Sequence, residues 1–192
     1  MRKLIFTIDS RKQALGMHMI RFVADKEIFD DVINGMIPEA KHSVWIGTSD
    51  LKDLYIPKGR QRAIPFLQVI SEMIGNGVTF RLIHAKEPGP NFRADFDRFP
   101  NLINSLERML CPRIHFKTVI VDQRIAYLGS ANLTGAGMGA KASTTRNFEN
   151  GIVTDEQSIV GKLIEQFDTL WMGENCDKCK RKSVCTDRID GN

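Results

Sequence analysis

The sequence lacks any apolar stretch long enough to cross a membrane. A spanning helix needs about 18 or more consecutive apolar residues, and no run in these 192 residues approaches that length. Near the start of the chain, a short apolar stretch follows Arg2 and Lys3 and ends at Asp9. That stretch is too short for the core of a signal peptide. We therefore expect a cytoplasmic protein with no transmembrane segment.

The sequence also lacks internal repeats, low-complexity segments and a large excess of either charge. Its 27 Lys and Arg residues outnumber its 23 Asp and Glu residues by only four. This modest basic excess permits a polyanionic partner but does not require one. The apolar share of 42% and the charged share of 26% are typical of a soluble globular protein. The length suits one domain with a sizeable core.

Cysteine is scarce, and its placement is uneven. Cys111 stands alone, whereas Cys176, Cys179 and Cys185 lie within ten residues. Thiols stay reduced in the cytoplasm, which disfavours a disulfide framework. Four thiolates are the number that a structural zinc ion or a cubane iron–sulfur cluster needs. We expect these four cysteines to bind a structural metal of open identity; the alternative is a buried Cys111 and a loosely ordered tail.

The spacing C-x2-C-x5-C is similar to that of the iron–sulfur clasp of RecB-family nucleases. Nothing else in the chain resembles that fold.

Apolar periodicity predicts alternating helices and strands. Helices are expected over residues 28–37, 66–74, 102–110 and 154–171, and strands over 44–46, 78–82, 114–122 and 125–128. The last helix opens on a capping-box pattern that starts at Thr154. Such alternation predicts an α/β layered domain. Because the periodicity ends near Trp171, we divide the chain into a domain of residues 1–172 and a polar, cysteine-bearing tail of residues 173–192.

The strand near residue 115 carries unusual polar residues. Period-two alternation places His115 and Lys117 on one face, together with Val119 and Val121. An unpaired buried ammonium is costly, so this face should border a polar cleft. Further along, Gly129 should let the backbone approach a ligand closely.

These residues form a longer pattern, H-x-K-x4-D-x6-G-S-x-N. It is filled by His115, Lys117, Asp122, Gly129, Ser130 and Asn132. The chain thereby resembles the phospholipase D superfamily over residues 17–172. The resemblance implies an α/β fold of that type, with a central mixed β-sheet flanked by helices on both faces. Asn147-Phe148-Glu149 is similar to the family's Asn-x-Glu element, in which the carboxylate, here Glu149, orients the catalytic histidine.

The residue types suit phosphodiester chemistry. A neutral imidazole at His115 can attack phosphorus and form a phosphohistidine intermediate. Lys117, Ser130 and Asn132 can stabilise charge on the non-bridging oxygens, so catalysis should need no metal or other cofactor. The motif aspartate, Asp122, is expected to have a structural or orienting role.

A second acid–base group must protonate the leaving oxygen and then activate water. Family members use a second motif histidine for this step, but the chain holds one copy of the motif. The other histidines, His18, His42 and His84, have no lysine two residues later, and we expect them to be structural. The resemblance therefore implies a homodimer in which the two His115 side chains meet at the two-fold axis.

Three functions fit these features. The first is a nuclease acting on DNA or RNA, favoured by the basic balance and by basic clusters at Lys58-Arg60-Arg62 and Lys178–Lys182. The second is a phospholipase or phosphatidyl transferase, which would want an apolar lip that the sequence does not clearly show. The third is a non-catalytic nucleic-acid-binding module. The glycine-rich segment 133–139 is expected to form a flexible loop beside the site.

Overall fold

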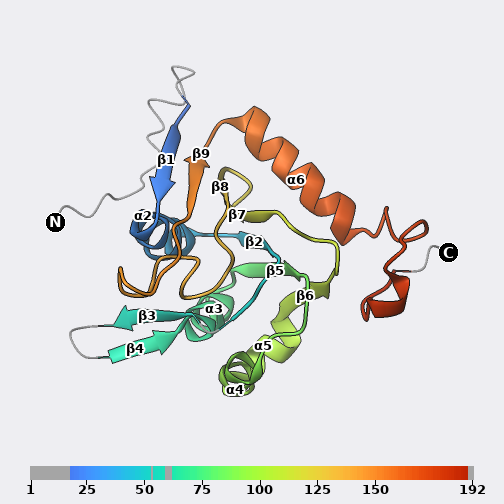
Figure 1. Cartoon of the computed structure of the whole chain (residues 1–192), viewed down its shortest axis with the longest axis horizontal. Helices are drawn as coiled ribbons and strands as arrows, with labels where there is room; N and C mark the ends of the chain where they lie inside the picture. Colours follow the sequence, from blue (N-terminus) through green and yellow to red (C-terminus); the bar gives the residue numbers. More distant parts are fainter. Residues whose placement is uncertain (1–17, 53, 59–61, 190–192) are drawn as a thin grey trace.

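The computed structural model describes residues 18–52, 54–58 and 62–189. A seven-stranded sheet crosses the centre of the molecule (Figure 1). In sheet order its strands are β1 (Ile20–Ala24), β9 (Asn150–Thr154), β8 (Ile125–Gly129), β7 (Lys117–Val121), β2 (Ser43–Thr48), β5 (Thr79–His84) and β6 (Leu106–Leu110). β2, β5 and β6 run parallel, and every other neighbouring pair is antiparallel. The predicted mixed sheet is therefore confirmed.

Helices cover both faces of this sheet, as expected. One face carries a continuous helical segment made of α2 (Lys26–Ile28), the π-helix η1 (Phe29–Met36) and the 3₁₀ turn η2 (Ile37–Glu39), together with α3 (Phe66–Gly75), α4 (Pro90–Asp97) and α5 (Pro100–Ser105). The other face carries α6 (Gln157–Trp171). A hairpin of β3 (Tyr55–Lys58) and β4 (Arg62–Pro65) extends from the first side (Figure 1). No helix in the described part of the chain is both long and apolar enough to span a bilayer.

Two apolar clusters fill the space between the helices and the sheet. Val119 and Val121 belong to the larger cluster, under η1 and α3, whereas Ile114 and Ile120 belong to the smaller one, under α6. The alternation predicted for this strand is thus confirmed. In the smaller cluster Phe167 of α6 stacks on the sheet, with its ring centroid 5.1 Å from that of Trp45.

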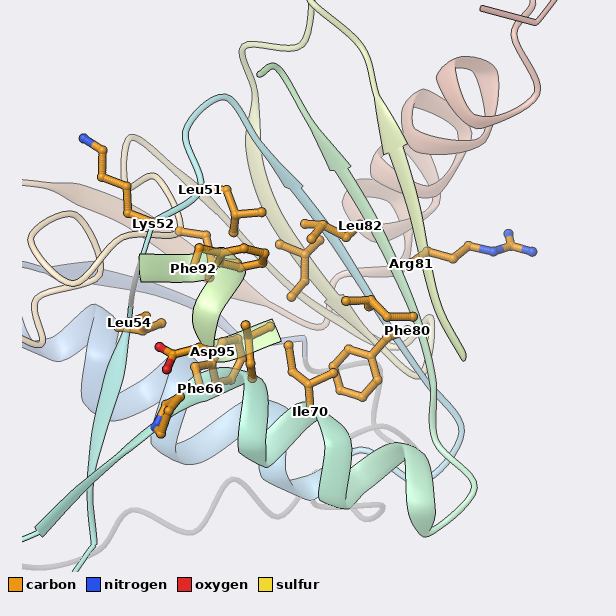
Figure 2. Close-up of a pocket in the computed structure, with 15 residues that line it drawn as sticks. Leu51, Lys52, Leu54, Phe66, Ile70, Phe80, Arg81, Leu82, Phe92 and Asp95 are labelled. Atoms are coloured by element: carbon orange, nitrogen blue, oxygen red, sulfur yellow. The ribbon is translucent and has the colours of Figure 1, made fainter. Parts of the chain in front are cut away.

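An apolar pocket lies inside the larger cluster, between α3, α4 and the sheet (Figure 2). Phe66 and Phe92 contribute to its wall, and its one acidic side chain is Asp95. Asp95 is buried and already paired, because it accepts a hydrogen bond from Tyr55 Oη at 3.0 Å and lies 2.6 Å from the guanidinium of Arg98. This pocket therefore belongs to the core.

The structure corrects several boundary predictions. The strand expected over 114–122 spans Lys117–Val121, so His115 lies just before it. The helix expected over 102–110 stops at Ser105, and Leu106–Leu110 form the edge strand β6. There Leu106, Met109 and Leu110 are buried beside β5, so tertiary pairing overrides the helical spacing. The last helix begins at Gln157, three residues later than predicted. Its cap is Glu156, whose side chain accepts from Ser158 N.

Candidate active site

One edge of the sheet gathers most of the predicted site residues. The register pairs Gly47 with Thr118, Lys117 with Gly129, and Gly129 with Gly151. The carboxyl ends of β2 and β8 therefore lie beside the amino ends of β7 and β9. The segments that continue from these ends are Thr48–Asp50, His115–Phe116, Ser130–Asn132 and Asn147–Glu149, so the motif residues between His115 and Asn132, apart from Asp122, share this edge with Glu149.

His115 and Lys117 differ sharply in exposure. The His115 side chain is exposed, and its ring makes no hydrogen bond or ion pair within the described part of the chain. Lys117 is only 9% exposed, and its Nζ donates to the backbone oxygen of His115 at 2.6 Å. An ammonium carries three donors, so two remain for a ligand beside the accessible imidazole.

Ser130 and Glu149 form a hydrogen-bonded unit at the same edge. Ser130 Oγ donates to the Glu149 carboxylate and accepts from Asn150 N at 3.1 Å. The other Glu149 oxygen accepts from Asn147 Nδ2 at 3.0 Å, and Glu149 N donates to Asp25 Oδ1 at 3.0 Å. Within one chain the carboxylate thus contacts Ser130 and Asn147, and the expected orienting bond to His115 is not among its described contacts.

The Asn132 side chain is largely committed to the protein itself. Its Oδ1 accepts from Ser49 Oγ at 2.8 Å, from Asp50 N at 3.1 Å and from Ser49 N at 3.2 Å. Thr48 Oγ1 in turn accepts from Leu133 N at 3.0 Å. This network ties the segment after β8 to the end of β2. Only the amide nitrogen of Asn132 is left to act as a donor toward a ligand.

Sequence reasoning missed the segment Thr48–Asp50. The signal was present, because these polar residues follow an apolar strand and ligands often bind at the carboxyl ends of strands in α/β sheets. Asp50 lies 3.0 Å from Lys52 Nζ and 3.1 Å from Lys86 Nζ. Burial opposes ionisation of Asp50, but the two ammonium groups outweigh it and hold its pKa below the ordinary value.

Of the remaining histidines, His84 lies at the same edge but is buried, and the other two lie at the opposite edge. His84 ends β5 but is only 2% exposed, and its Nδ1 lies 2.8 Å from the Lys86 carbonyl oxygen. Burial lowers its pKa and so favours the neutral ring. His18 and His42 belong to the opposite edge, beside Asp155 and beside Asp122 respectively. These are the chain's four histidines, so within one chain His115 is the one exposed histidine at this edge.

Asp122 is separated from the other motif residues by the length of β7. It lies five residues beyond Lys117, about 16 Å at the rise of a strand. Its carboxylate accepts three backbone N–H bonds, from Lys41 at 2.8 Å, His42 at 2.7 Å and Ser43 at 2.9 Å. The structure thus places Asp122 as a clamp on the start of β2, and not with the reacting groups.

Replacing Asp122 with asparagine should lower the free energy of unfolding by about 2 kcal/mol at neutral pH, because an amide accepts the three N–H bonds poorly. Burial alone would raise the pKa of Asp122, but these bonds bring it below 3.8. The carboxylate's contribution is therefore present above the unfolded-state pKa and is lost as pH falls through the lower folded-state pKa. Urea unfolding should show a smaller difference in the free energy of unfolding between this variant and the parent chain at pH 3 than at pH 7.

Asp97→Asn is the matched control for this measurement, because Asp97 is exposed at the end of α4. It should change the free energy of unfolding little at either pH. An equal loss of unfolding free energy in Asp122→Asn at both pH values would contradict stabilisation by the ionised Asp122 carboxylate.

Two glycine positions differ from what the sequence indicated. A methyl group at Gly129 would lie 2.3 Å from Tyr127 Oη and 2.5 Å from Asn150 O, so close packing on β9, and not a ligand, requires glycine there. Gly139 has a φ of +77°, and its missing Cβ makes room for Asp25 O. Together with the burial of Thr134 and Met138, this makes segment 133–139 a packed turn and not the expected flexible loop.

A largely apolar part of the sheet beside the site is uncovered. A hollow there is lined by Phe22, Phe116, Lys117, Leu128, Ile152 and Leu163, among others. Phe22 pairs with Ile152 across the sheet, and its side chain is 65% exposed. Ile20, on the same face, is 61% exposed, and Phe148, next to Glu149, is 91% exposed. Gly129 and Asn150, which adjoin Ser130 and Glu149 in the sequence, also line the hollow, so the apolar surface reaches the candidate site edge.

Comparisons with known proteins agree with this fold. The family described as "Cardiolipin synthase, PLD-like domain" matches residues 33–171. No curated protein is similar enough in sequence to count as a match. Similar solved structures include NucT from Helicobacter pylori, with 17% identity, a TM-score of 0.58 and coverage of 81% of this chain and 96% of that one. Nuc from Salmonella typhimurium, a phospholipase D family member, has 17% identity and a TM-score of 0.58, with coverage of 80% of this chain and 94% of that one.

Two larger proteins share the fold over part of their length. One is TrmBL2, an archaeal chromatin protein whose structure shows a mode of DNA binding, with 16% identity, a TM-score of 0.53 and coverage of 80% of this chain and 52% of that one. The other is the phosphatidylserine synthase of Haemophilus influenzae, with 17% identity, a TM-score of 0.53 and coverage of 80% of this chain and 39% of that one.

Proposed function

This chain belongs to the phospholipase D superfamily, and we propose that it is a phosphodiesterase that cleaves nucleic acid through a covalent phosphohistidine. The observation that carries the proposal is the meeting of an exposed His115, the Lys117 ammonium and the Ser130 hydroxyl at one sheet edge. An imidazole nitrogen of His115 attacks phosphorus and displaces the leaving oxygen, and water then cleaves the P–N bond.

Charge on the phosphoryl oxygens needs donors that are fixed before the reaction. Lys117 fits this role because its stem is buried and its ammonium is anchored on the His115 carbonyl. The Asn132 amide is also fixed, since Oδ1 is held by the end of β2. Ser130 keeps its hydroxyl between Glu149 and Asn150. These preset positions suit a reaction that proceeds without a catalytic metal.

A nucleic-acid strand suits the surroundings of the site better than a lipid. Lys52 and Lys86 flank Asp50 at the same edge and present two ammonium groups that can contact phosphates. Together with Asp50 and Glu87 they line a hollow beside α4, into which a phosphate backbone could continue. The fold's occurrence in a DNA-binding chromatin protein supports this choice, and its occurrence in a phosphatidylserine synthase makes a lipid the substrate to test against.

The reaction requires a second acid–base group, and we propose that a second copy of this chain supplies it. The exposed edge of one chain holds His115 but no second exposed histidine, since His84 is buried. The apolar surface around Phe22 adjoins the same edge and is a suitable contact. A two-fold axis there would bring the two Ser130–Asn132 segments together and let each His115 serve the other.

The purified chain, incubated in EDTA with labelled DNA, RNA and phosphatidylcholine, should cleave a nucleic acid and leave the lipid intact. Lys117→Ala should lower kcat by about 10²–10³-fold, as loss of an oxyanion donor typically does. Lys162→Ala, on the outer side of α6, is the control and should leave the rate unchanged. If only the lipid is cleaved, the substrate is a lipid and not a nucleic acid. If none of the three substrates is cleaved, the alternative is a non-catalytic nucleic-acid-binding module. DNA retention in a filter assay would detect that binding.

A further inference from the structure

The four cysteines of the chain surround one hollow at the end of α6. Cys111 lies in the turn after β6, and the other three follow α6. Their side chains line the hollow together with Leu110, Pro112, Arg113 and Leu170. All four thiols are free, and all are partly exposed. Residues up to 74 positions apart in sequence are thus brought to one small region that the proposed phosphodiesterase chemistry does not use.

Little apolar burial holds the tail in this place. Between Gly173 and Ile189 the chain forms no strand, and its one helical element is the 3₁₀ turn Lys182–Val184. Val184 is 58% exposed and Ile189 is 38% exposed. Such a segment buries too little apolar surface to offset the entropy of ordering it. Another interaction is therefore needed to explain its folded path.

Polar contacts nevertheless tie the tail to the end of β6. Asp187 accepts from Leu110 N at 2.7 Å, and Cys185 Sγ donates to Leu110 O at 3.7 Å. Gly173, with a φ of +73°, turns the chain back, and a methyl group there would lie 2.7 Å from Ile189. These contacts place Cys185 next to the segment that carries Cys111.

The backbone between Cys176 and Arg181 forms a turn that places one N–H on the sulfur of Cys179. Arg181 N donates to Cys179 Sγ at 3.4 Å, and Cys179 N donates to Cys176 O at 3.0 Å. A backbone N–H aimed at a sulfur two residues earlier favours the thiolate that a metal requires. Arg113 and Lys182 also line the hollow and would offset the net negative charge of a four-thiolate centre.

We propose that Cys111, Cys176, Cys179 and Cys185 together bind a structural metal centre, either one zinc ion or an iron–sulfur cluster. In the described part of the chain no three such side chains already stand at coordinating positions, so binding must draw the sulfurs inward. Sites of this kind are completed by the metal, and binding energy becomes folding energy. The centre would fasten the tail to Cys111, four residues before His115, and so fix the approach to the catalytic strand.

The test is elemental analysis and visible absorption of the full chain, purified anaerobically and then reconstituted either with zinc chloride or with iron and sulfide. We expect about one zinc per chain and no colour, or about four irons per chain with a brown absorption band. Cys111→Ser and Cys179→Ser should each lose most of the bound metal and melt at a lower temperature. Ser183→Ala, an exposed change inside the same tail, should retain both.

Three outcomes would overturn the proposal: no metal after purification and reconstitution, four titratable thiols in the presence of either metal, or full metal content in Cys111→Ser. Full metal content in Cys111→Ser would mean that the metal binds within the tail alone and does not connect the tail to Cys111. None of these measurements uses phosphodiesterase activity, so the metal centre and the proposed function can fail separately.

Discussion

A chain in which His115 is replaced by alanine should lose turnover, with a fall of about 10⁴-fold or more, because the proposed nucleophile is removed. The change should leave folding intact, since the His115 side chain is exposed and makes no side-chain hydrogen bond within the described residues. His42→Ala is the matched control, because His42 is also exposed and lies at the opposite edge of the sheet. Its activity should equal that of the parent chain.

Acid quenching during turnover of phosphorus-labelled substrate should trap a covalent phosphohistidine in the parent chain and none in His115→Ala. The reaction should continue in EDTA, because in the proposed mechanism the ammonium of Lys117 takes the place that a metal cation would occupy next to the phosphoryl oxygens. Full dependence on added magnesium would contradict this mechanism. So would a labelled phosphohistidine in the alanine variant.

Much of the structure of β7 could be predicted from the local sequence pattern. Alternation assigned Val119 and Ile120 to opposite faces, and the two apolar clusters confirm it. The same reasoning failed at Leu106–Leu110, where a helical spacing became an edge strand. Periodicity records which residues are buried, but the partner strand that satisfies the backbone lies far away in sequence.

The site was foreseen less completely than the fold. The motif supplied its residues but not its distances, so it grouped Asp122 with residues that lie at the other end of β7. It also gave no hint that Glu149 contacts Ser130, or that Asn132 is held by Ser49. These contacts depend on which strands are neighbours in the sheet. The order β9-β8-β7-β2 brings together segments as far as 85 residues apart.

Placing an aspartate at Phe22 should dissociate the proposed dimer and reduce activity to the level of the His115→Ala chain. Phe22 is 65% exposed on the apolar surface next to Lys117, and a carboxylate buried there without a partner is costly. Ile103→Asp is the matched control, because Ile103 is 63% exposed on α5, on the other side of the sheet. Light scattering and the nucleic-acid assay would be run on both variants.

The two variants carry the same new charge at side chains of almost equal exposure, so they separate loss of the interface from a general effect of surface charge. We expect Ile103→Asp to remain a fully active dimer and Phe22→Asp to be an inactive monomer with an unchanged melting temperature. In the parent chain, activity per chain should fall on dilution in step with the dimer fraction. A Phe22→Asp monomer that retains full activity would show that one chain completes both acid–base steps by itself. A parent chain that is monomeric and active at every concentration would show the same.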